Sequence, residues 1–197
     1  MHKCVIALFL AVLLFAASAY AQKPRVVVLD PTLPKAWVES LVWEASALHG
    51  LQFLPTRYKR DPLNGAQMGW PEVAYRIYNL RNSRLHKRMR RYGPVHYLHG
   101  KTRENYIAGA ALLSKEISVG YVTQARANGS DGSALAVTVI THEIGHNRCA
   151  THTTDNTIMN TLALGFPVQP RTWAEQSVKE MQRCWKPAKL LCARRAQ

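Results

Sequence analysis

Two histidines and a glutamate stand at a spacing that suits a metal ion. Residues 142–146 read His-Glu-Ile-Gly-His, and His152 follows shortly after. On an α-helix, side chains four positions apart share one face, so His142 and His146 can direct two imidazoles at the same ion. Three protein ligands and one water make the catalytic form of a zinc site. The residues leave the third ligand open, and His152 is the leading candidate.

Glu143 follows the first histidine directly. In this position its carboxylate reaches a water molecule on the metal ion more readily than the ion itself. Zinc lowers the pKa of such a water towards neutrality, and a carboxylate beside it takes the proton as attack begins. The pattern predicts that Glu143 is a general base.

The element that must carry these residues covers 132–147. Its β-branched residues alone would suit a strand, but its length and the shared face of the two histidines favour a helix. Apolar residues recur at helical spacing at 135, 136, 139, 140 and 144. The plain alternative is a buried helix whose histidines are satisfied by hydrogen bonds.

Residues 142–152 resemble the zinc-binding signature of the metzincin peptidases, HExxHxxGxxH, and Ile158-Met159 resembles their Met-turn. The resemblance covers about residues 105–185. It implies that the zinc ligands are His142, His146 and His152, that Glu143 is the general base, and that Met159 forms a hydrophobic floor below the metal.

The sequence departs from the metzincin pattern at two positions. Cys149 replaces the glycine that lets the chain turn sharply towards the third histidine, and a non-glycine residue at positive φ costs about 1 kcal/mol. Asn160 stands where some members have a tyrosine after the Met-turn.

Hydrophobic periodicity predicts a single α+β domain, which by resemblance is a metzincin-like zincin domain. A twisted mixed sheet would carry the active-site helix and a C-terminal helix. Strands 25–30 and 51–55, joined by a helix over 34–50, form a parallel unit. By resemblance, strand 108–113 is the edge that holds an extended substrate. The other expected elements are a helix over 72–92, strands over 95–99 and 116–123, and a final helix over 172–184.

The N-terminus carries a targeting pattern. A charged start, an apolar run and Ala19-Tyr20-Ala21 predict a signal peptide over 1–21, with an uncleaved anchor as the alternative. The single catalytic domain would then span 22–197. We expect a secreted or periplasmic monomer.

The chain is strongly basic. Lys and Arg number 26 against 12 Asp and Glu, which gives a formal net charge of +14. Such a charge predicts attraction to anionic surfaces and excludes nothing about the fold. The helix over 72–92 is rich in Arg and Lys, which suits a solvated face or a contact with nucleic acid or anionic lipid. No nucleic-acid-binding motif accompanies it, so we expect no specific nucleic-acid partner.

After removal of the signal peptide the cysteines are Cys149, Cys184 and Cys192. In an oxidising compartment this odd number predicts one disulfide, with three pairings open. A bridge from Cys149 to the C-terminal segment is favoured, because it would brace the turn before the third histidine. His96 and His99 point to different sides of a strand, and we expect both to be structural or exposed.

The resulting prediction is a zinc-dependent endopeptidase acting on proteins or peptides, with Zn²⁺ as its cofactor. In one alternative the third ligand is acidic and comes from Glu175 or Glu180, with Asp155 a weaker substitute. In the other, the chain is a non-catalytic, secreted basic binding protein with a structural zinc site. Glu143 argues against the latter, since a structural zinc needs no base and normally has four protein ligands.

Overall fold

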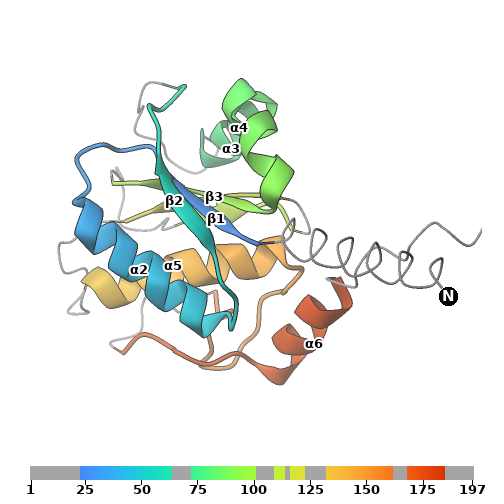
Figure 1. The fold of residues 1–197 in the computed structure, drawn as a ribbon. Coiled ribbons are helices and arrows are strands. Elements are labelled where there is room, and N and C mark those ends of the chain that lie inside the picture. Colours follow the sequence, from blue (N-terminus) through green and yellow to red (C-terminus); the bar gives the residue numbers. More distant parts are fainter. Residues whose placement is uncertain are drawn as a thin grey trace, which may run out of the picture.

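The fold is built on one five-stranded sheet in the order β2-β1-β3-β5-β4 (Figure 1). The computed structural model describes residues 23–63, 72–100, 109–113, 116–122, 132–161 and 168–184. Neighbouring strands are parallel except β4, which is antiparallel to β5 at one edge. The strands are β1 (Arg25–Val28), β2 (Leu54–Tyr58), β3 (Val95–His99), β4 (Gly109–Ala111) and β5 (Ile117–Tyr121).

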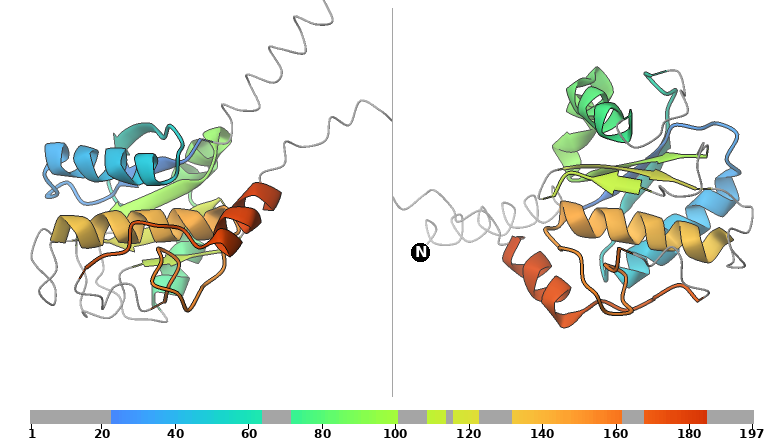
Figure 2. Two further views of the ribbon diagram at one scale, coloured as in Figure 1. Left: turned by 90° about the horizontal axis from the view of Figure 1, so that it is seen from below. Right: turned by 180° about the vertical axis from the view of Figure 1, so that it is seen from behind.

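Helices cover both faces of this sheet (Figures 1 and 2). On one face lie α2 (Lys35–Leu48) and α5 (Gly132–Asn147), and on the other α3 (Glu72–Asn82) and α4 (Arg84–Met89), followed by a 3₁₀ turn at Arg90–Tyr92. A last helix, α6 (Glu175–Cys184), lies near the C-terminal end of α5. The mixed sheet with a helix over 132–147 and a C-terminal helix is as predicted, but it is mostly parallel and covered on both faces, as in an α/β fold.

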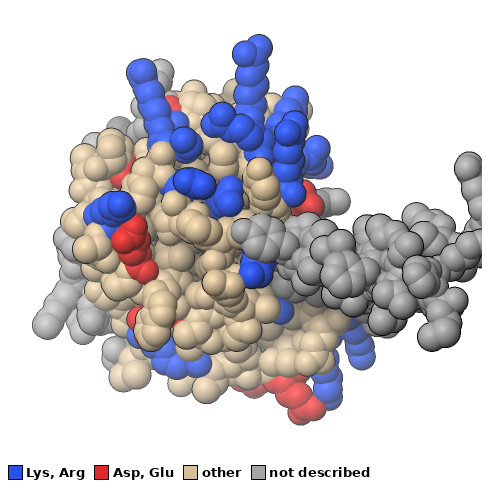
Figure 3. Space-filling model, viewed as in Figure 1, with Lys and Arg blue, Asp and Glu red and all other residues tan. Residues whose placement is uncertain are grey.

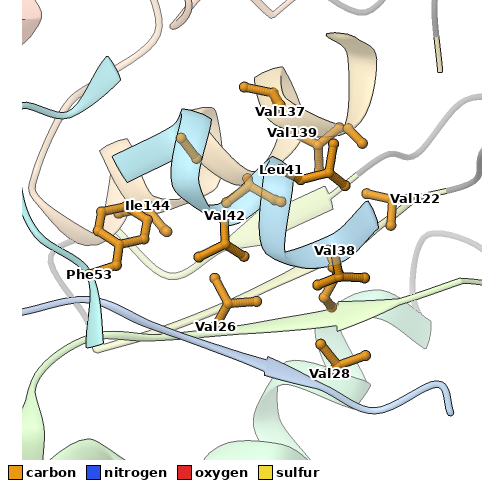
Figure 4. Packing of buried hydrophobic residues seen from close by; sticks show 14 residues of the cluster. Val26, Val28, Val38, Leu41, Val42, Phe53, Val122, Val137, Val139 and Ile144 are labelled. Carbon is orange, nitrogen blue, oxygen red and sulfur yellow. The ribbon is translucent and has the colours of Figure 1, made fainter. Parts of the chain in front are cut away.

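Strand β1 divides the core into two parts. Its residues Val26 and Val28 pack against α2 and α5, whereas Val27 belongs to the cluster beneath α3 and α4. This alternation follows from the two-residue period of a strand. Figure 4 shows the first cluster, in which aliphatic side chains of β1, α2 and α5 interdigitate. A membrane-spanning helix needs about 20 mostly apolar residues, and none is found in the described part of the chain.

Helix α5 is almost wholly buried, in keeping with its apolar composition. Its threonines do not favour a strand here, because Thr138 and Thr141 donate their hydroxyls to the carbonyls of Ala134 and Val137, one turn earlier. Such back-bonding satisfies a buried hydroxyl within a helix. The prediction of a helix over 132–147 is confirmed.

Two other elements differ from prediction because serine side chains redirect the chain. Ser46 accepts a hydrogen bond from the backbone N–H of Phe53, so the chain after α2 closes the helix end before β2 begins at Leu54. Ser83 accepts from the backbone N–H of His86 and caps α4, which divides the helix predicted over 72–92.

Candidate metal centre

Three imidazole rings converge at the C-terminal end of α5. The Nε2 atom of His146 lies 3.1 Å from that of His142 and 3.1 Å from that of His152. The Nε2 atoms of His142 and His152 are 3.3 Å apart. These are the described residues whose ligand atoms are close enough together to hold a metal ion.

Backbone carbonyls fix the tautomers of the two helical histidines. The Nδ1 atom of His142 lies 2.7 Å from the carbonyl oxygen of Ile158, and that of His146 lies 2.8 Å from the carbonyl oxygen of Ala150. Both Nδ1 atoms are therefore donors, and both Nε2 atoms carry a lone pair directed at the centre of the triad. Lone pairs at this distance repel one another unless a cation lies between them. The residues fit a metal ion.

The separations also suit zinc. Zinc binds imidazole nitrogen at about 2.0–2.1 Å with tetrahedral geometry, which places two ligand nitrogens about 3.3 Å apart. Burial lowers the pKa of His142 to about 4, and the neighbouring imidazole of His146 acts in the same direction. A neutral imidazole is the form that binds a metal ion.

His152 reaches the triad through a left-handed turn at Cys149, whose φ is 74°. The N–H of Ala150 donates to the carbonyl of Gly145, and the N–H of Cys149 donates to that of His146. This pair of bonds is the Schellman ending of a helix, in which glycine is the usual left-handed residue. A disulfide joins Cys149 to Cys184 on α6, as favoured from the sequence. The remaining cysteine, Cys192, lies outside the described residues.

The acidic residues considered as third ligands have other partners. Glu180 accepts hydrogen bonds from the backbone N–H and the hydroxyl of Thr151, at 2.7 Å and 2.9 Å. Glu175 is exposed and pairs with Lys179. Neither these carboxylates nor that of Asp155 belongs to the group that could hold an ion. Glu180 instead anchors the segment that carries His152.

Glu143 is buried against the edge strand. A Cβ atom added at Gly109 of β4 would lie 2.6 Å from Oε1 of Glu143, so only glycine lets the strand approach so closely. Burial raises the pKa of Glu143 to about 8. Among the described residues, its Oε2 atom has no hydrogen-bond partner. This carboxylate is thus held beside β4 with one oxygen uncommitted. The role of Gly109 was not predicted, although a glycine within a strand can mark a close approach of this kind.

Met159 is fully buried near the helix that carries the histidines. A Cβ atom added at Gly145 would lie 2.8 Å from the Met159 sulfur, so the glycine makes room for this contact. Asn160 donates to the carbonyls of Thr154 and Asp155, and so serves the loop that ends at Met159. The predicted role of Met159 as a floor below the metal stays a prediction.

A buried histidine outside the triad, His49, was not singled out from the sequence and holds α5 in place. The Nε2 atom of His49 lies 3.1 Å from the carbonyl oxygen of Thr141, and Arg148 donates to its Nδ1 at 3.1 Å. His49 therefore bonds to the backbone before the first triad histidine and to a side chain after the second. Burial, helped by the charge of Arg148, lowers the pKa of His49 to about 3, so it is neutral. Its place directly after α2 gives no sequence signal of this contact.

His96 and His99 lie away from the triad, in agreement with the expectation that they are not ligands. The Nδ1 atom of His96 lies 2.9 Å from the hydroxyl oxygen of Ser118. His99 lies between two carboxylates, with Nδ1 3.9 Å from Asp30 and Nε2 3.6 Å from Asp61. Both rings are buried and structural.

No protein-family model matches the sequence, and no curated protein matches it. Several solved structures are similar. The archaemetzincin of Methanopyrus kandleri aligns with a TM-score of 0.59 and 18% identity, covering 83% of this chain and 94% of that chain. The archaemetzincin of Archaeoglobus fulgidus, complexed with malonate, gives 0.57 and 16%, covering 81% and 99%. Metalloproteinase-II from Bacteroides fragilis gives 0.58 and 15%, covering 84% and 53%. At these identities the likeness shows a shared fold.

Proposed function

We propose that this chain is a zinc-dependent endopeptidase of metzincin type. The observation that carries the proposal is the convergence of three imidazole Nε2 atoms, two of them with tautomers fixed by carbonyls, on the helix that also holds Glu143. His142, His146 and His152 would be the ligands. The fold shared with proteins described as archaemetzincins and a metalloproteinase supports the same reading.

The chemistry divides between the ion and the chain. A bound zinc ion would supply a Lewis acid, which acidifies water and polarises a peptide carbonyl. Burial favours the protonated form of Glu143, and the charge of a bound ion would favour its ionised form. Ionised Glu143 would accept the proton of the attacking water and deliver it to the nitrogen of the leaving amine. The carboxylate thus ends the cycle in the state in which it began.

The substrate proposed is an extended peptide that pairs with β4. This strand lies at the edge of the sheet, where a further strand can add through backbone hydrogen bonds. Because Gly109 lies directly against Glu143, a peptide on the outer side of β4 would pass close to the base. Substitution of Gly109 by alanine would push the strand and the carboxylate apart.

The experiment that tests the proposal is cleavage of a mixed peptide library by the zinc-loaded protein. Glu143→Gln keeps the shape of the side chain and removes the base, so cleavage should fall by at least about 100-fold while zinc stays bound. Glu39→Gln removes an exposed carboxylate on α2 and is the matched control. Cleavage fragments also report the side-chain preference.

Two results would contradict the proposal. A protein that binds zinc through the three histidines but cleaves no peptide of the library would be the non-catalytic basic binding protein. Equal cleavage by Glu143→Gln and the parent protein would remove Glu143 from the mechanism.

Export forms part of the proposal. What supports it is the pattern of residues 1–21, which lie outside the described residues, and the disulfide, which persists in oxidising compartments. N-terminal sequencing of the protein recovered from culture medium or periplasm should begin at Gln22. A chain that still begins at Met1 in a membrane fraction would favour the anchor.

A further inference from the structure

The face of the molecule formed by α3, α4 and the following 3₁₀ turn is densely basic (Figure 3). Between residues 73 and 103 the sequence contains no Asp or Glu. We call the exposed cations of this stretch the basic face. They are Arg81, Arg84, Lys87, Arg88, Arg90 and Arg91.

The cations of the basic face have no ion-pair partner among the described residues. Arg84 and Arg88 stand four positions apart on one helix, a like-charge spacing that destabilises it. These positive charges also act on a buried group. Burial lowers the pKa of His86 to about 4, and the charges of Arg90 and Arg81 act in the same direction.

Other surface helices of the protein balance their charges. On α2, Lys35 pairs with Glu39, and on α6, Lys179 pairs with Glu175. A merely solvated helix can satisfy its charges in this way. As far as the described residues go, the basic face therefore differs from α2 and α6 in having no such pair, which points to a polyanionic partner.

Exposed tyrosines accompany the cations. Tyr75 and Tyr78 are 64% and 61% exposed, and together with Arg81 they recur every third residue along one side of α3. Tyr92, at the end of the stretch, is also exposed. Tyrosine with arginine or lysine is the composition favoured at a lipid headgroup layer.

The shape favours a membrane over a single-stranded nucleic acid. Single strands are bound in grooves that follow the backbone, whereas the side chains of the basic face project outwards from the molecule (Figure 3). The apolar side of α3 faces the core through Val73, Ile77 and Leu80, so it is not free to insert into a bilayer. Attraction would therefore be electrostatic, at headgroup level.

We propose that the basic face docks the protein on membranes that expose anionic phospholipid headgroups. The geometry leaves the metal centre open, because α3 and α4 lie on one face of the sheet and α5 lies on the other (Figures 1 and 2). This inference does not depend on the proposed peptidase activity.

The test is sedimentation of the full protein with vesicles of phosphatidylcholine alone and of equal parts phosphatidylcholine and phosphatidylglycerol. Binding should require phosphatidylglycerol and weaken with salt. A variant in which four exposed cations are neutralised, Arg84→Gln, Lys87→Gln, Arg88→Gln and Arg91→Gln, should bind more weakly by about two to three orders of magnitude. The control removes the same charge from α2, α6 and the segment before α6, through Lys35→Gln, Arg171→Gln, Lys179→Gln and Arg183→Gln.

Three results would overturn the proposal. One is equal loss in both variants, which would make binding a matter of net charge. Another is absence of binding to phosphatidylglycerol vesicles at low salt. The third is a single-stranded oligonucleotide that binds more tightly than the vesicles and displaces them, which would assign the basic face to nucleic acid. Circular dichroism of both variants confirms that each is folded.

Discussion

The three histidines of the triad are positioned in two different ways. His142 and His146 lie on α5 and meet because of helix geometry. Backbone carbonyls orient their rings, and His49 bonds to the backbone of the helix. His152 lies on a loop, and its position depends on the turn at Cys149 and on two anchors from α6. The relative position of the two helical histidines is set by their four-residue separation on one helix, so substitutions elsewhere in the chain disturb it little. The third histidine is held by contacts distant in sequence, so it is the part of the centre that substitutions can loosen selectively.

The largest expected effect tests whether the loop histidine is a ligand at all. His152→Ala should lower zinc affinity by more than about 1,000-fold, as should His142→Ala, because either change leaves two imidazoles. Competition with a chelator of known affinity measures this. Glu175→Ala is the control and should keep full affinity. Zinc retained by His152→Ala and lost by Glu175→Ala would transfer the third ligand to α6.

Removal of the disulfide should affect the loop and spare the helical pair. The bridge closes a sequence separation of 35 residues, so Cys184→Ser should lower the free energy of unfolding by about 3–4 kcal/mol. Zinc affinity should fall by about tenfold, since His152 would sample more positions. Urea unfolding and chelator competition measure the two effects. Cys192→Ser is the control, and an equal effect there would contradict the role of the bridge.

His49, which bonds to α5, makes the stability of the fold depend on pH. The pKa of His49 is about 3 in the folded protein and 6.5 in the unfolded chain. Below pH 6.5 the unfolded chain takes up a proton that the folded protein does not, so stability is full above pH 6.5 and falls as pH decreases towards 3. The loss from this residue is about 2 kcal/mol at pH 5.

His49→Gln isolates this contribution. Urea unfolding of metal-free protein should show a pH dependence shallower by up to about 1.4 kcal/mol per pH unit below pH 6.5 than in the parent protein. The triad histidines contribute equally to both proteins and cancel. Identical slopes would show that His49 is protonated in the fold, which would contradict its bond with Arg148.

The smallest expected effect concerns the backbone of the loop. In a Cys184→Ser background, Cys149→Gly should raise stability by about 1 kcal/mol, because glycine adopts positive φ without the cost of a Cβ atom. Cys149→Ala in the same background should bring no gain. A gain from alanine as well would mean that loss of the free thiol, and not relief of the turn, is responsible.

The contrast between the helical histidines and the loop histidine also explains what could be predicted from the sequence. The helix over 132–147, the strand Arg25–Val28 and the helix that begins after Pro34 follow from local periodicity, and all three are present. The start of β2 and the break at Ser83 depend on single serine hydroxyls, which periodicity does not register.

Contacts between elements escaped prediction for the same reason. The approach of Gly109 to Glu143, the bond of Arg148 to His49 and the anchor from Glu180 to Thr151 each join residues far apart in the chain. Glu180 was considered as a ligand because of its chemical type. Only the tertiary structure shows that its carboxylate is occupied by backbone.

The bridge between Cys149 and Cys184 imposes an order on how the centre is assembled. The helical pair can form as soon as α5 does, whereas the last histidine is secured only after a segment made later in synthesis has folded back and been oxidised. In a reducing environment His142 and His146 would keep their positions, whereas His152 would be held less firmly. Maturation of the site is thus coupled to the redox state of the surroundings, through a covalent bond that includes none of the three histidines.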